Sequence, residues 1–288
     1  MKSHYNNILV PTDFSEQSLL ALEQAYALAK LLNVEITLLH VIPETSNDIR
    51  LGLFTKWNPK MQQNDYEESC YAHLLQISES ASKISWVKVN PLLLKGKVHE
   101  KIIMIARDIY AKFIVMAANS SDPEQKRAFI GSNTSRVIRE ATCPILTFNG
   151  SNIREHFDTI ILPLDLSQET QQKVSKAIEI AKYYNSTIRV ISILLTDEEE
   201  VVKKLTTQLN QVKEYIENRD IYITSKIIHG DKTLGKLTSY ILDYAHEING
   251  DLIMIMTPET NLREKFLGTI DNEIICQSKI PVLTVNHK

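Results

Sequence analysis

Apolar residues fall into two recurring patterns along the chain: short continuous runs, and longer segments in which they return every three or four positions. The runs at 7–11 and 34–42 predict buried strands, whereas the spaced pattern within 16–32 predicts an amphipathic helix. Ser15 stands just before that helix, where its hydroxyl suits the N-cap. Strands alternating with helices predict a parallel sheet with helices on both faces.

The same alternation continues to the end of the chain. The pattern predicts strands at 7–11, 34–42, 87–94, 112–117, 144–148, 159–163, 187–194, 222–228, 251–256 and 282–285. It predicts helices at 16–32, 66–82, 98–110, 133–140, 168–184, 197–218, 233–248 and 266–277.

The two halves of this pattern are copies of one another. A shift of 152 places Ile8–Ser15 on Ile160–Ser167, and a shift of 137 places Pro144–Thr147 on Pro281–Thr284. Repeats of this kind indicate two domains of related fold, expected at 1–149 and 154–288. The second copy is shorter mainly because residues 44–66 have no counterpart in it, and an ordinary surface insertion explains them best.

Composition excludes several classes of function. The chain has 288 residues but only 8 glycines, and neither G-x-G-x-x-G nor a P-loop motif occurs. The net charge is -3 and neither half is basic, so we expect no nucleic-acid partner. The three cysteines are widely separated, which fits a reducing compartment. No apolar run has the length of a membrane span and the start lacks a signal-peptide core, so we expect a cytoplasmic protein without a membrane partner.

Parallel α/β folds bind ligands beyond the carboxyl ends of their strands, which directs attention to a few polar residues. Asp13 and Asp165 each follow a strand and precede a helix, where the acid could hold a ribose hydroxyl or a metal, or could cap the helix. Gly131–Thr134 and Gly268–Thr269 enter helices and offer a phosphate seat, although a helix start capped by Ser or Thr is the simpler interpretation.

Other chemistry finds little support in the sequence. The eight histidines form no metal-ligand spacing, and a structural or surface role is expected for each, although His99 and His229 flank the end of the third strand of their copies. No nucleophile elbow occurs, and Cys143 suits packing better than nucleophilic catalysis. We therefore expect a binding module that is not an enzyme.

Taken in order, these residues resemble the universal stress protein family, twice over. The family's opening strand and turn stand here as Ile8–Ser15 and, more loosely, as Ile160–Ser167. Its fourth strand resembles 113–116 and 252–255, and its closing Gly-Ser, helix and Cys-Pro-Val segment resembles 131–145 and 268–282.

The resemblance implies two Rossmann-like domains of the adenine nucleotide alpha hydrolase-like type, each with a five-stranded parallel sheet. Family members dimerise through the last strand, so a tandem chain is expected to form that dimer internally, which leaves room for a further homodimer. Many members bind ATP or a related nucleotide. Carried over to this chain, Asp13 would contact the ribose, the Val41 backbone the adenine, and Gly131 and Ser132 the phosphates.

The candidate binding residues implied in this way come from both copies. In the first copy they are Pro11, Thr12, Asp13, Val41, Ala117, Gly131, Ser132 and Asn133. In the second copy they are Asp165, Gly268 and Thr269, with Ile193 in the place of Val41.

The chain departs from the family's G-x2-G-x9-G-[ST] loop at its first two glycines. Ala117 and Ser120 replace them in the first copy, and Met256 and Glu259 in the second. Glycine permits a close approach of backbone to ligand, which Met and Glu do not. We therefore expect ATP, ADP or AMP only in the first copy, and the alternative is a nucleotide-free interaction scaffold that has lost both sites.

Overall fold

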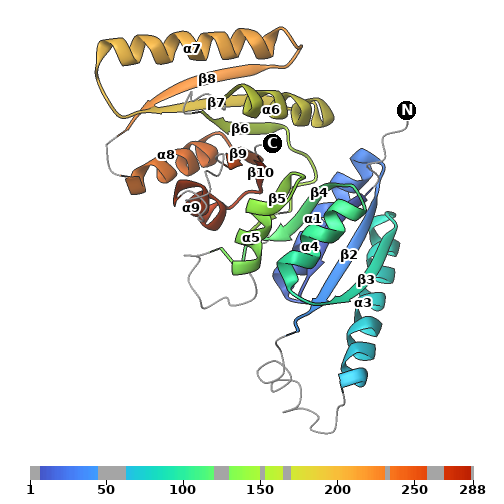
Figure 1. Cartoon of the computed structure of the whole chain (residues 1–288). Coiled ribbons are helices and arrows are strands. Elements are labelled where there is room, and N and C mark those ends of the chain that lie inside the picture. Colours follow the sequence, from blue (N-terminus) through green and yellow to red (C-terminus); the bar gives the residue numbers. More distant parts are fainter. Residues whose placement is uncertain are drawn as a thin grey trace.

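The structure, a computed structural model, describes residues 7–44, 63–119, 130–149, 153–164, 170–230, 234–257 and 269–286. Each predicted strand and helix has a counterpart there (Figure 1). The first half contains β1 (Asn7–Thr12), α1 (Glu16–Leu32), β2 (Glu35–Ile42), α3 (Gln63–Ser85), β3 (Val89–Lys95), α4 (Val98–Asp108), β4 (Ala111–Ala117), α5 (Ser132–Glu140) and β5 (Ile145–Phe148). The second half contains β6 (Thr159–Pro163), α6 (Thr170–Tyr184), β7 (Thr187–Leu194), α7 (Glu199–Glu217), β8 (Ile223–His229), α8 (Leu234–Glu247), β9 (Leu252–Thr257), α9 (Thr269–Gln277) and β10 (Val282–Asn286).

The strands form one ten-stranded sheet in the order β3-β2-β1-β4-β5-β10-β9-β6-β7-β8. Pairing is parallel within each half, and the two last strands, β5 and β10, pair antiparallel with Leu146 opposite Leu283. The fold is therefore two five-stranded Rossmann-like units joined as an internal pseudo-dimer through their last strands. Both the fold class and this junction agree with the expectation from the sequence.

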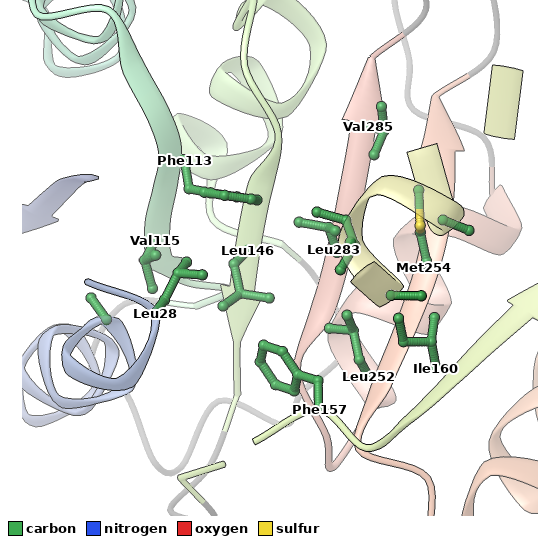
Figure 2. Close-up of a cluster of buried hydrophobic side chains, with 14 of the residues drawn as sticks. Leu28, Phe113, Val115, Leu146, Phe157, Ile160, Leu252, Met254, Leu283 and Val285 are labelled. Carbon is green, nitrogen blue, oxygen red and sulfur yellow. The ribbon is translucent and has the colours of Figure 1, made fainter. Parts of the chain in front are cut away.

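The sheet is covered on both faces by helices. Apolar residues of α1, α3, α6 and α7 form one buried cluster with alternate strand residues, and those of α4, α5, α8 and α9 form a second cluster on the other face. Alternation decides which cluster a strand residue joins: Ile8 and Val10 face the first, and Leu9 faces the second. The first cluster crosses the junction between the halves, where Leu146 and Leu283 lie close to each other (Figure 2).

Polar side chains fix the junction from both sides. Asn149 Nδ2 donates to the carbonyl of Cys276, at the end of α9, and Asn286 Nδ2 donates to the carbonyl of Ala141, just past α5. Each half thus satisfies a backbone carbonyl at a helix end of the other half, where the helix itself supplies no partner. The side chain of Gln24 on α1 adds a third tie, because it bonds both the amide and the carbonyl of Arg154.

Local sequence explains where α1 begins and ends. Ser15 is its N-cap and accepts a hydrogen bond from the amide of Ser18 at 3.3 Å. Asn33 ends it in the left-handed region with φ 50°, a conformation that asparagine tolerates. The helix therefore starts directly after the Thr12–Phe14 turn, and this positions the turn at the carboxyl edge of β1.

Among the described residues, no helix combines the length and the apolar character needed to cross a bilayer.

Candidate functional site

A cavity of about 220 Å³ opens at the carboxyl ends of β1, β2 and β4 in the first half. Its lining includes all eight residues predicted for this copy, which come from four separate segments of the chain: Pro11, Thr12, Asp13, Val41, Ala117, Gly131, Ser132 and Asn133. The cavity lies beside β1 and β4, where the strand order reverses, and ligands of such folds bind at this switch point.

The turn after β1 is held by its own hydroxyl groups. Thr12 Oγ1 lies 2.8 Å from Ser18 Oγ and accepts a hydrogen bond from the amide of Phe14 at 3.0 Å. The Asp13 carboxylate accepts hydrogen bonds from the amide and the hydroxyl of Ser15 and remains exposed to solvent. Because Ser15 is the N-cap of α1, Asp13 does not cap this helix. Its carboxylate is held at the cavity instead, where a ligand hydroxyl can reach it.

Behind this turn lies an aromatic pair that the sequence did not reveal. His40 on β2 is 8% exposed, and its Nδ1 lies 2.8 Å from the carbonyl oxygen of Thr12. Since a carbonyl only accepts, Nδ1 carries the proton. The His40 ring stacks on Phe14 with centroids 4.2 Å apart, and Phe14 has φ 66°. A bulky residue in this region of φ is strained, so the stack and the buried bond together hold the turn in its conformation.

The start of α5 supplies backbone donors. Gly131 is the N-cap residue, and no side chain caps the helix. The interpretation of this segment as a Ser- or Thr-capped helix start is therefore wrong for the first half. Thr134 Oγ1 instead donates to the carbonyl of Ala117 at 3.3 Å, which fastens the helix start to the end of β4. Amides of a first helical turn have no partner within the helix, so this end of α5 favours an anion.

The fold itself does not require glycine at 131. Its φ and ψ are -54° and 140°, which any residue adopts, and an added Cβ would lie 3.5 Å from Thr134 Oγ1 and 3.8 Å from the Ala118 oxygen. These are ordinary contacts. Glycine at this position therefore leaves open space over the amides of α5, and does not relieve strain in the backbone.

The remaining wall of the cavity is apolar. The pairing of β2 with β1 ends at Thr12 opposite His40, whereas its pairing with β3 continues to Ile42. The last residues of β2, including Val41, therefore have no strand partner on the β1 side. Apolar side chains from β2, α4 and β4 complete this wall: Leu39, Val98, Ile102 and Met116. Such a wall suits a flat heterocycle.

The described lining of the cavity carries little charge. Asp13 contributes the only carboxylate among the described lining residues, and none of these residues is a lysine or an arginine. The helix N-terminus is thus the positive element that the described residues present to an anion. Within the described chain no three His, Cys, Asp or Glu side chains gather as metal ligands.

The equivalent position in the second half is built differently. The carbonyl of Leu164, the counterpart of Thr12, accepts from Ser192 Oγ at 2.6 Å, so a hydroxyl replaces the imidazole of His40. Gly230 lies so close to Ile193 Cγ2 and Tyr240 Cε2 that a Cβ would stand only 2.8 and 2.9 Å from them. The backbone at Gly230 is therefore close to Ile193, the residue that corresponds to Val41. The corresponding glycine of the first half, Gly96, is packed as closely, because a Cβ there would lie 2.7 Å from Lys101 Cε.

Several of the positions predicted for the second half cannot be placed in its site. Asp165, Gly268 and Glu259 lie outside the described residues, as do Ser120 and most of the insertion at 44–66, whereas Thr269 begins α9. Met256, which replaces a family glycine, is buried and lines a separate cavity at the junction, together with Cys143, Val285 and residues of α6.

The histidine that lines the first cavity is not one that the sequence singled out. His99, which follows the third strand of the first copy, does not line this cavity, whereas His40 does. The i, i+4 spacing of Val98 and Ile102 could have indicated that these two residues share a helix face. No local pattern marks His40 as a site residue, because its partner, the Thr12 carbonyl, is 28 residues away.

Comparison with known families gives a consistent answer for both halves. The model described as "Universal stress protein family" matches residues 4–149 and again 156–286. Among curated proteins, the chain is 29% identical over 164 residues to Universal stress protein MJ0577 of Methanocaldococcus jannaschii, which covers 53% of this chain and 99% of that protein. It is also 29% identical over 143 residues to Universal stress protein MJ0531 of the same organism, covering 49% of this chain and 81% of that protein.

Solved structures agree on the fold of the whole chain. A universal stress protein from Archaeoglobus fulgidus DSM 4304 matches with a TM-score of 0.74 at 21% identity, over 99% of this chain and 98% of that one. A putative universal stress protein from Pseudomonas aeruginosa UCBPP-PA14 matches with a TM-score of 0.66 at 16% identity, over 98% and 93%. At these identities the likeness concerns the fold alone.

Proposed function

The chain belongs to the universal stress protein family in both of its halves, and from that premise we propose that its first half binds an adenine nucleotide and acts as a regulatory binding module, not as a catalyst. The observation that carries this proposal is the convergence of eight predicted residues from four segments on one cavity. The purine would lie against the apolar wall near Val41 and the ribose hydroxyls at Asp13. The phosphate would lie beside Gly131 at the amides of Ser132 and Asn133, because the Gly131 amide already donates to the Ala118 carbonyl.

The charge around the cavity predicts the order in which AMP, ADP and ATP bind. No lysine or arginine occurs among the described lining residues, and the Asp13 carboxylate repels a polyphosphate. AMP therefore fits the described lining better than ATP. We expect dissociation constants that rise in the order AMP, ADP, ATP when the three are compared by titration calorimetry at one ionic strength, without added divalent cations.

Gly131→Ala is the most discriminating variant. A Cβ there makes only ordinary contacts within the protein, so the variant should fold with an unchanged melting temperature. It would, however, stand over the amides that hold the phosphate. We expect AMP affinity to fall at least about 10-fold, which corresponds to about 1.4 kcal/mol, whereas adenosine, which has no phosphate, should bind as it does to the unmodified chain.

Two results would decide against the proposal. Absence of heat and of any thermal shift with all three nucleotides would sink it, and so would equal AMP affinity in Gly131→Ala and the unmodified chain. Asp13→Asn serves as a second probe, because it keeps the polar contact to Ser15 but removes the carboxylate. Its effect should be larger on adenosine than on adenine.

The rival function is that of a nucleotide-free scaffold. The lack of lysine and arginine among the described lining residues favours it, because phosphate sites commonly carry one. Mass spectrometry of the protein purified under native conditions separates the two, since a copurified purine nucleotide is incompatible with the scaffold alone.

A further inference from the structure

The helix that carries the proposed phosphate contacts ends against the other half of the molecule. The first turn of α5, with the amides of Ser132 and Asn133, lies at the cavity of the first half, and Ala141 follows the last turn. The carbonyl of Ala141 accepts a hydrogen bond from Nδ2 of Asn286, the last residue of β10. α5 also packs against β10 at the boundary between the halves (Figure 1). One short helix therefore connects the candidate site with the second half.

The position of α5 depends on what holds its two ends. The helix has nine residues, a length of about 14 Å, and helices this short are not stable by themselves. Buried apolar side chains hold one face of it in the second core cluster, but no side chain caps its start. Polar bonds lie at both ends: Thr134 donates to the carbonyl of Ala117 near the start, and Asn286 donates to the carbonyl of Ala141 at the end.

The amide of Asn286 is oriented by a second contact, within its own half. Because a carbonyl only accepts, Nδ2 must face Ala141, and Oδ1 accepts a hydrogen bond from Thr257 Oγ1 at 2.9 Å. Thr257 ends β9, and both Thr257 and Ala141 are buried. Loss of the Asn286 amide would therefore remove a hydrogen-bond partner from two polar groups of buried residues, one in each half.

We propose that Asn286 is a positioning residue for the first-half site: it fixes the far end of α5 and thereby aims the amides of Ser132 and Asn133 at the phosphate. This inference rests on the nucleotide function proposed above, and it gives the second half a task in that binding. Without the bond at its end, α5 can tilt about its start, and hydrogen bonds weaken steeply as their angle departs from linear. The adenosine part of the ligand, at Val41 and Asp13, would be unaffected because neither residue belongs to α5.

The chain itself offers a matched control in the pseudo-symmetric bond. Asn149 Nδ2 donates to the carbonyl of Cys276 near the end of α9, so it joins the halves in the same way but holds the helix of the other half. We expect Asn286→Ala and Asn149→Ala to lower the melting temperature to a similar extent. In titration calorimetry only Asn286→Ala should weaken AMP binding, by at least about 5-fold, and adenosine affinity should stay within about 2-fold of that of the unmodified chain in both variants.

Two further variants test the route from Asn286 to the phosphate. Thr257→Val keeps the amide of Asn286 but removes the hydroxyl that orients it, so AMP affinity should fall by a smaller factor than in Asn286→Ala, with adenosine affinity again unchanged. In the Gly131→Ala background the phosphate contact is already lost. Adding Asn286→Ala there should cause no further loss of AMP affinity, because both substitutions act on one interaction.

The outcomes separate this inference from the function on which it rests. An unmodified chain that binds neither AMP nor adenosine overturns the nucleotide function and this inference with it. If AMP binds but Asn286→Ala and Asn149→Ala change its affinity equally, or if Asn286→Ala weakens AMP and adenosine by the same factor, only the positioning role of Asn286 is overturned. Should Asn286→Ala fold too poorly for calorimetry, the same comparison of AMP with adenosine is decided with Thr257→Val.

Discussion

The two halves of the molecule share one fold but differ at the carboxyl ends of their strands. In the first half the carbonyl after β1 is bonded by the imidazole of His40, which stacks on Phe14 beside an open cavity. In the second half the equivalent carbonyl is bonded by the hydroxyl of Ser192, and the backbone at Gly230 packs tightly against Ile193. The comparison teaches that both halves need a hydrogen bond to this carbonyl, and that an imidazole makes it in one half and a hydroxyl in the other.

The junction shows the opposite behaviour, because there the halves are nearly equivalent. Asn149 and Asn286 occupy corresponding positions, and each bonds a backbone carbonyl at a helix end of the other half. The junction contacts are thus alike in the two halves, whereas His40 and Ala117 of the first half are replaced by Ser192 and Met256 in the second. The predictions below separate these two classes.

His40→Ala should have the largest effect on stability. It removes a buried ring together with its hydrogen bond to Thr12, at a cost of about 3 kcal/mol. We expect the midpoint of urea unfolding to fall with an unchanged slope, and nucleotide affinity to fall with it because the Asp13 turn loses its support. His40→Asn keeps a donor but not the stacked ring. If it matches the unmodified chain in stability, the stacking has no importance for the turn.

Ser192→Ala tests the corresponding bond in the second half. It leaves the buried carbonyl of Leu164 without this donor but removes no ring, so the expected loss is about 1 kcal/mol. Nucleotide affinity should not change, because the cavity lies in the first half. Calorimetry on this variant checks the assignment of the site, and a drop in AMP affinity would contradict it.

Asp220→Trp should have an effect no larger than that of Ser192→Ala. It places a bulky residue at φ 60°, the conformation that Trp86 has in the other half. The substitution should lower the free energy of unfolding by about 1 kcal/mol. The expected change is a decrease of about 2–4 °C in melting temperature. Asp220→Asn provides the control and should melt like the unmodified chain. An unchanged melting temperature for Asp220→Trp would mean that Trp86 bears no backbone cost.

Much of this architecture could be predicted because its determinants are local or repeated. The hydroxyl of Ser15 before an apolar helical pattern fixed the start of α1, and the shift that superposes Ile8–Ser15 on Ile160–Ser167 predicted two copies of one unit. The resemblance to the family led to Asp13, Val41 and Gly131, which do meet at one cavity. The roles of these residues remain predictions.

Other features of the site could not be predicted from the sequence. His40 is one of eight histidines, and it lies within an apolar strand pattern. Its role of holding the turn after β1 appears only in the folded chain, where the pairing of β1 with β2 brings the Thr12 carbonyl opposite it. The sequence favoured a helix start capped by Ser or Thr at Gly131, but in the folded chain no side chain caps α5. Thr134 instead bonds the end of β4, because β4 lies next to α5 only in the folded chain.

By itself, the sequence determined the order of strands and helices, the repeat and the family, because hydrophobic period, capping and glycine positions act over a few residues. The tertiary structure alone decided that His40 bonds the Thr12 carbonyl, that Gly131 leaves space the fold does not need, and that Trp86 is exposed. Each of these facts depends on atoms that are distant in the chain and adjacent in space. The physical reason is that packing and long-range hydrogen bonds exist only once the sheet has formed.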